Sequence, residues 1–275
     1  MRMAKHGEAI DRSLDGWTRE EFTAHGITRP ILRRGSGPGL MLLPELPGVT
    51  PEVLTLGNRL VTAGFTVVVP ALVGVPGRPR TTASAVLATA RVCLSREFRA
   101  LARDAERPVA GFLRALAKHL HGEAGHQGVG VIGMDFSGGL ALAAATEPAV
   151  LAAVLSGPTL PLAPTGAARR DPGCSARELA EVRARARRGE LRVAGLRFSH
   201  DRRCPPERLI GLRRVLGAAF DLIEIDSGPG NPHGLPPDAH HVLTEGYVDR
   251  PGHPTVQALA RVVTLIRSRV APEEP

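Results

Sequence analysis

Short apolar segments alternate with helical segments along most of the chain, and this alternation restricts the folds it can adopt. Apolar runs of strand length occupy residues 39–44, 65–70, 129–134, 151–156, 191–199 and 220–226. Segments with helical spacing follow them at 51–64, 108–120, 138–147, 175–189, 206–217 and 253–270. Apolar strands that alternate with helices are typical of a parallel sheet covered on both faces. We therefore predict an α/β fold with a mostly parallel, doubly wound sheet flanked by helices.

The rest of the chain is compatible with a single domain over residues 1–275. Residues 1–20 predict an irregular or partly helical lead-in, and residues 21–37 predict two short strands around a turn at His25-Gly26. The Pro/Gly-rich segment 156–173 is interpreted as a functional loop over the sheet rather than a domain boundary. A chain of 275 residues is long enough for one large domain.

Composition limits the partners that we expect. The net charge of +8 comes mostly from arginines spread along the chain, so a compositional bias or an anionic small-molecule substrate explains it better than nucleic acid. The three cysteines form no CxxC pair, and we expect no metal and no organic cofactor. The polar start and the lack of a long apolar run indicate a cytoplasmic protein without a membrane partner. We expect a monomer or a homodimer.

The segment GMDFSGG, residues 133–139, has the pattern of a nucleophile elbow. An elbow needs a strand, a sharp turn and a helix, with small residues two before and two after the nucleophile. Around Asp135 these positions are Gly133 and Ser137, so Asp135 stands where a Ser or Cys is usual. Two other interpretations remain open at this point. Ser137 is the nucleophile with Gly139 two residues later, or Asp135 only caps the following helix.

Four segments, in the same order, resemble the dienelactone hydrolase family of α/β-hydrolases. They are LPELPGVTPEV (43–53), VGVIGMDFSGGLALA (129–143), LRFSHDRRCPPERL (196–209) and DAHHVLTE (238–245). The similarity of layout extends over about residues 20–270 and implies an α/β-hydrolase fold without a large cap domain. In that family the elbow carries a cysteine nucleophile, so Asp135 is a departure at the catalytic position.

The resemblance also implies the remaining members of a catalytic triad. Asp201 stands where the family keeps the acid that orients the histidine, and His240 stands where it keeps the base. His241 and His233 are nearby alternatives to His240, whereas His253 is interpreted as a helix-start residue.

Further site residues follow from the same resemblance. Glu45 matches the family's glutamate beside the oxyanion hole, and the backbone N–H groups of Leu46 and Phe136 would form that hole. Arg96 is either a substrate-binding arginine or a solvated helix arginine.

An aspartate at the elbow changes the chemistry that we expect. A carboxylate is already ionised at neutral pH and needs no base to activate it. Its attack on an ester would give an anhydride that mostly reverts, so lactone or ester hydrolysis by that route is disfavoured. Attack on an epoxide or on a carbon bearing a halide gives an alkyl ester, which water activated by His240 can hydrolyse. Trp17, Tyr247 and a protonated Glu45 are the possible leaving-group donors.

The sequence thus predicts a hydrolase-like enzyme that acts on a small organic molecule, with Asp135 as nucleophile or acid/base. Two alternatives remain. Asp135 is a general acid/base in a non-hydrolytic cyclisation, isomerisation or elimination, or the protein is a catalytically silent binding homologue.

Overall fold

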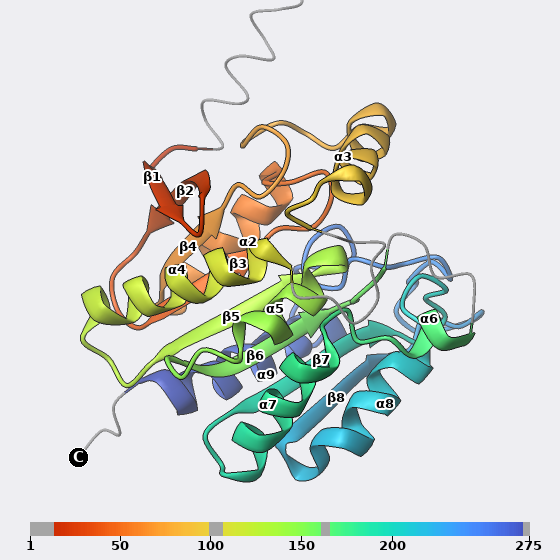
Figure 1. The fold of residues 1–275 in the computed structure, drawn as a ribbon. Helices are drawn as coiled ribbons and strands as arrows, with labels where there is room; N and C mark the ends of the chain where they lie inside the picture. Colours follow the sequence, from red (N-terminus) through yellow and green to blue (C-terminus); the bar gives the residue numbers. More distant parts are fainter. Residues whose placement is uncertain (1–13, 99–106, 161–165, 272–275) are drawn as a thin grey trace, which may run out of the picture.

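A computed structural model of the protein describes residues 14–98, 107–160 and 166–271. Within these residues, one eight-stranded sheet has the strand order β1-β2-β4-β3-β5-β6-β7-β8. Figure 1 shows it as a twisted sheet with helices on both sides. The strands are β1 (Thr18–Ala24), β2 (Ile27–Arg34), β3 (Gly39–Leu43), β4 (Thr66–Pro70), β5 (Val129–Met134), β6 (Val150–Ser156), β7 (Arg192–Phe198) and β8 (Phe220–Ile225).

The sheet is mostly parallel, as predicted. β1 pairs antiparallel with β2, and β2 pairs antiparallel with β4. All the other neighbours, from β4 through β3 and β5 to β8, are parallel. Parallel strands bring their carboxyl ends to one edge of the sheet, and ligands of such folds bind there. The residues that follow β3, β5 and β7 therefore meet at this edge.

Helices cover both faces of the sheet. α4, α5, α7 and α8 pack on one face, while α2 and α9 pack on the other. The helices are α2 (Pro51–Thr62), α3 (Thr82–Leu94), α4 (Pro108–Ala124), α5 (Gly138–Ala144), α6 (Gly166–Arg170), α7 (Ala176–Arg187), α8 (Pro206–Leu216) and α9 (Pro254–Val270). Two short 3₁₀ turns, η1 (Asp135–Ser137) and η2 (Gly217–Ala219), precede α5 and β8.

The apolar residues of β3 show why the sheet is doubly wound. Met41 and Leu43 lie in the hydrophobic core beneath α4 and α5, whereas Leu40 and Leu42 lie in the core beneath α2 and α9. Successive side chains of a strand point to opposite faces, so a continuous apolar run fits only a strand that is buried on both sides.

Local signals at the helix ends agree with the predicted boundaries. The Thr50 side chain accepts a hydrogen bond from the backbone N–H of Val53, and Pro51 occupies the first turn of α2. Ser175 and Glu178 form a capping box at the start of α7. Each of these pairs satisfies backbone donors that a helix start leaves without an intrahelical partner.

Two features differ from the sequence expectations. β1 takes in Thr18–Ala24, so the end of the predicted lead-in 1–20 is strand, while residues 1–13 lie outside the described residues. α3 and α6 are additional helices near the carboxyl edge, and no large cap domain lies there within the described residues. Among all the residues that the structure describes, no helix is both long and apolar enough to span a membrane.

Candidate active site

The turn after β5 has the strained geometry of a nucleophile elbow. Asp135 has a φ of +53°, a conformation that few non-glycine residues adopt. A Cβ atom at Gly133 would lie 2.3 Å from the carbonyl oxygen of Ser137, and one at Gly139 would lie 2.3 Å from that of Gly173. Glycine is therefore required at position 133 for the strand to approach the turn, and at position 139 for the start of α5 to approach the loop before α7.

Ser137 supports this turn from inside the protein. Its side chain is fully buried, and its Oγ accepts a hydrogen bond from the backbone N–H of Met134 at 2.8 Å. The same hydroxyl lies 2.8 Å from the carbonyl oxygen of Met134 and 3.1 Å from that of Leu43 on the neighbouring strand. This position argues against Ser137 as the nucleophile, because its oxygen is committed to the backbone.

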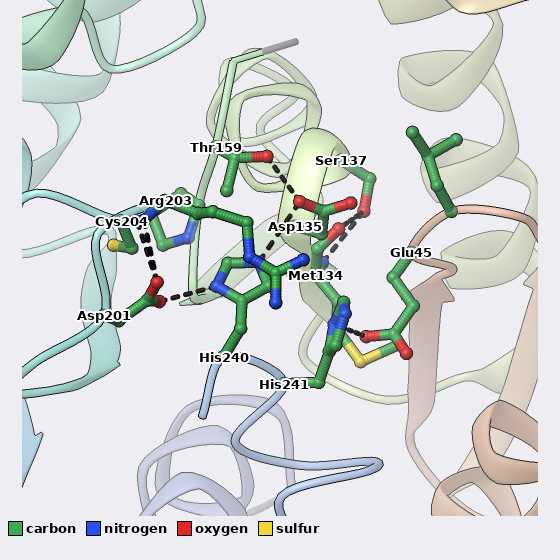
Figure 2. A network of polar contacts seen from close by, with 12 residues as sticks. Glu45, Met134, Asp135, Ser137, Thr159, Asp201, Arg203, Cys204, His240 and His241 are labelled. Atoms are coloured by element: carbon green, nitrogen blue, oxygen red, sulfur yellow. Dashed lines mark hydrogen bonds and ion pairs between the residues drawn. The ribbon is translucent and has the colours of Figure 1, made fainter. Parts of the chain in front are cut away.

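Asp135, His240 and Asp201 lie in line at the carboxyl edge of the sheet (Figure 2). The His240 Nε2 atom is 3.3 Å from Oδ1 of Asp135, and its Nδ1 atom donates to Oδ2 of Asp201 at 2.5 Å. The other oxygen of Asp201 accepts the backbone N–H groups of Arg203 and Cys204 at 2.9 and 3.3 Å. The three predicted triad residues thus come together.

The two carboxylates and the histidine shift one another's protonation. Burial favours the neutral form of Asp135, but the hydrogen bond and charge of His240, with the hydrogen bond of Thr159, lower its pKa to about 2. Burial opposes the charged form of His240 as well, yet the hydrogen bonds and charges of Asp135 and Asp201 raise its pKa. Burial favours the neutral form of Asp201 too, but the hydrogen bond and charge of His240, together with the N–H groups of Arg203 and Cys204, lower its pKa. Both carboxylates therefore favour the protonated form of His240, which lies between them.

Thr159 was not singled out by the sequence, although its loop, 156–173, was expected to be functional. Its hydroxyl donates to Oδ1 of Asp135, the oxygen that also faces His240. Its backbone N–H donates to the carbonyl oxygen of Asp135 at 3.1 Å. Among the described residues nothing donates to Oδ2, and 13% of the Asp135 side chain is exposed. The carboxylate is thus fixed by one oxygen and open at the other, rather than used as a helix cap.

Glu45 belongs to a second buried network beside the triad. Its carboxylate lies 2.7 Å from Nδ1 of His241 and accepts the Thr244 hydroxyl at 2.9 Å, while Arg80 approaches to 3.4 Å. The Arg80 guanidinium also donates to the carbonyl oxygen of Leu46. The Glu45 carboxylate is thus engaged with three side chains, so the structure gives no support to Glu45 as a leaving-group donor.

The alternative histidines have other contacts. His241 packs edge-on against His240 and points its Nδ1 atom at Glu45, so it does not occupy the base position. His253 caps α9 by accepting the backbone N–H of Thr255, as predicted for a helix-start residue. The ring of His233 packs against His253.

A cleft of about 380 Å³ opens beside Asp135. Leu46 and Phe136 line it, so the residues of the expected oxyanion hole border the same space as the Asp135 carboxylate. Its other lining residues are Arg80, Ala85, Thr89, Thr159, Leu160, Arg169, Arg202, Arg203 and Pro205.

Three residues considered from the sequence lie elsewhere. Arg96 is exposed in the turn after α3 and is not part of this lining, so the structure gives no support to a substrate-binding Arg96. Trp17 packs against Gly57 of α2, and the Tyr247 ring lies 4.1 Å from the Arg59 guanidinium carbon. Neither aromatic side chain borders the cleft as a leaving-group donor.

The model of one known protein family matches about half of the chain. The model of the dienelactone hydrolase family matches residues 29–169, which is 141 of the 275 residues. The chain belongs to the dienelactone hydrolase family. The matched part contains the elbow, Thr159 and Glu45, whereas Asp201 and His240 lie beyond it. A search of curated protein sequences finds no significant match.

Solved structures confirm the fold of this family member. A dienelactone hydrolase from Anabaena variabilis has a TM-score of 0.57 at 15% identity and covers 93% of this chain and 98% of its own. A dienelactone hydrolase-like promiscuous phosphotriesterase from metagenomic libraries has a TM-score of 0.58 at 14% identity, with coverage of 93% and 98%. The 2,6-dihydroxy-pseudo-oxynicotine hydrolase has a TM-score of 0.56 at 16% identity, with coverage of 93% and 70%. The protein is a hydrolase-like enzyme with an α/β-hydrolase fold.

Proposed function

We propose that the enzyme hydrolyses a small organic molecule through an ester formed on Asp135, by attack on an epoxide or on a carbon that bears a halide. One observation carries this proposal. Thr159 and His240 both contact Oδ1 of Asp135, while Oδ2 accepts no hydrogen bond from a described residue. A carboxylate that is fixed by one oxygen and open at the other is oriented for nucleophilic attack.

In the first step, Oδ2 of Asp135 forms a bond to the substrate carbon as the bond to the leaving group breaks. The electron pair leaves on the halide or on the opened ring oxygen, and that oxygen takes the proton from His240. A pKa of about 2 supports this role, because Asp135 is then fully ionised at neutral pH and is a weak base. The same low pKa disfavours general acid/base catalysis by Asp135.

The second step hydrolyses the ester. Esterification removes the charge of Asp135, one of the causes that raise the pKa of His240. The pKa of His240 then falls, which favours its neutral form; where no ring oxygen took its proton in the first step, that proton goes to solvent. The neutral imidazole takes a proton from water, whose oxygen attacks the ester carbonyl carbon. The oxyanion forms on Oδ1, which the Thr159 hydroxyl contacts, and the N–H groups of Leu46 and Phe136 are proposed to stabilise it further. Collapse breaks the Cγ–Oδ2 bond of Asp135, so Oδ2 leaves with the alcohol, which takes the proton back from His240. The new carboxylic acid of Asp135 releases its proton to His240 or to solvent.

A substrate panel tests this proposal. Styrene oxide, 2-chloropropionate and p-nitrophenyl acetate are offered to the wild type, to Asp135→Asn and to Asp135→Cys. Asparagine tolerates a positive φ, so Asp135→Asn is expected to keep the turn. We expect turnover of the epoxide or the haloacid by the wild type only, and ester hydrolysis to appear in Asp135→Cys. Full epoxide or haloacid turnover by Asp135→Asn would show that the carboxylate is not the nucleophile.

A further inference from the structure

Two arginines in the cleft have no carboxylate partner in the part of the chain that the structure describes. Arg202 and Arg203 follow the triad acid in the loop after β7, and both side chains are exposed. Among the described residues, neither guanidinium makes an ion pair or a hydrogen bond. Figure 2 shows the Arg203 side chain extending from this loop toward the Asp135–His240 pair. A positive charge without a partner is therefore present in the space that Asp135 borders.

The other cleft arginines differ in this respect. Arg80 is paired with Glu45 at 3.4 Å and with Glu245 at 3.1 Å, and Arg169 is paired with Glu207 at 3.3 Å. Asp201, the nearest acid in the sequence to Arg202 and Arg203, directs its oxygens to His240 and to two backbone N–H groups. The charges of Arg202 and Arg203 consequently remain available to a ligand.

Part of the remaining lining of the cleft is apolar. Leu46, Phe136, Leu160 and Ala85 border it, and Leu46 and Phe136 are themselves mostly buried. The lining therefore combines apolar surface with two adjacent guanidinium groups, those of Arg202 and Arg203, from one loop. Such a combination suits a ligand that has an apolar body and one anionic group.

We infer that Arg202 and Arg203 form a binding subsite for an oxyanion, a carboxylate or a phosphate, carried by a small organic substrate. The planar fork of a guanidinium matches the geometry of both groups. The two positive charges also offset the repulsion between an anionic substrate and the ionised Asp135. The inference rests on the proposed function only in placing the reacting carbon of that substrate next to Asp135.

Binding of simple probes tests the subsite without any turnover. Phenylacetate and phenyl phosphate are titrated by calorimetry into the wild type and into Asp135→Asn, with phenylacetamide as the neutral analogue of the same shape. We expect phenylacetate, phenyl phosphate or both to bind at least about tenfold more tightly than phenylacetamide. The reason is that the amide cannot make a charge-assisted bidentate contact with a guanidinium group. Equal binding of both anions and the amide would overturn the inference.

Arginine variants locate the binding. Arg202→Gln and Arg203→Gln are each expected to weaken binding of the anion by about tenfold, whereas Arg214→Gln is expected to leave it unchanged. Arg214 is an exposed arginine of α8 outside the cleft lining, so it controls for the loss of net charge. An Arg202→Gln/Arg203→Gln double variant that keeps its thermal stability and binds the anion like the wild type would also overturn the inference.

The two proposals can fail separately. Arginine-dependent binding of the anion with no turnover of epoxides or haloacids would retain the subsite and remove the proposed reaction. Turnover that is lost in Asp135→Asn but insensitive to charge at positions 202 and 203 would retain the reaction and remove the subsite.

Discussion

The imidazole of His240 lies with its Nε2 atom 3.3 Å from Oδ1 of Asp135, while its other nitrogen is bonded to Asp201. The histidine is thus held between two carboxylates. A serine or cysteine at the elbow would need this histidine to remove its proton, but an aspartate does not. His240 is therefore available for the later step, in which water attacks the ester.

Replacing His240 should separate the two chemical steps. With His240→Gln we expect the ester on Asp135 to form and to accumulate, because its hydrolysis loses a general base worth about 10²–10⁴-fold in rate. Intact-protein mass spectrometry after incubation with 2-chloropropionate would show the adduct. His119→Gln, on the exposed surface of α4, is the matched control and should show none. An unmodified His240→Gln protein with normal turnover would contradict the assignment of His240.

Thr159 is expected to be a positioning residue that acts through Asp135. Thr159→Val removes the hydroxyl that donates to Oδ1 but keeps the side-chain shape. We expect kcat to fall about tenfold with little change in KM, because one hydrogen bond that orients the carboxylate is lost. Loss of the same bond should also raise the pKa of Asp135.

Thr89→Val is the control for this change. Thr89 also lines the cleft, but its hydroxyl donates to the Ala85 carbonyl of its own helix. Equal kinetic effects of the two substitutions would show that the contact of Thr159 with Asp135 is not important.

Ser137→Ala separates a structural serine from a nucleophile. Removing the buried hydroxyl leaves the Met134 N–H without its partner, so we expect the free energy of unfolding to fall by about 1–3 kcal/mol. Turnover by the folded fraction should persist. A folded Ser137→Ala variant without activity would restore Ser137 as the nucleophile.

The pKa shifts predict how stability depends on pH. The pKa of Asp135 is lowered from 3.8 to about 2, so its stabilising contribution is present above about pH 4 and is lost as the pH falls through about 2. The pKa of His240 is raised above 6.5, so its contribution is present below that value and is lost as the pH rises through the folded-state pKa. The Tm difference between wild type and His240→Gln should therefore be largest between about pH 4 and 6.5. A difference that grows at alkaline pH would contradict these shifts.

Much of the fold could be predicted because its strands are apolar on both faces. The run at residues 129–134 is strand β5, with all six residues buried, and its Gly133 allows the close turn at Asp135. α3 was missed because its pattern is weak. Only Ala88 and Val92 of that helix are buried, while Val86, Leu87 and Leu94 are exposed.

The site was predictable where residues follow strand ends and not where they depend on loops. Asp135 directly follows strand β5, and Asp201 comes shortly after strand β7. The carboxyl ends of these parallel strands meet at one edge of the sheet. Thr159, Arg202 and Arg203 reach the cleft through loop conformations that carry no periodic signal. Arg96 was considered on similarity of position alone, and the turn after α3 places it outside the cleft lining.

The covalent role of Asp135 has one direct measurement. A single turnover with excess enzyme is run in ¹⁸O-labelled water, and the peptide that contains Asp135 is then weighed by mass spectrometry. The ester mechanism predicts that one labelled oxygen enters the Asp135 carboxylate, because water attacks the carbonyl carbon of the ester. Label found only in the product, with Asp135 unlabelled, would contradict the mechanism.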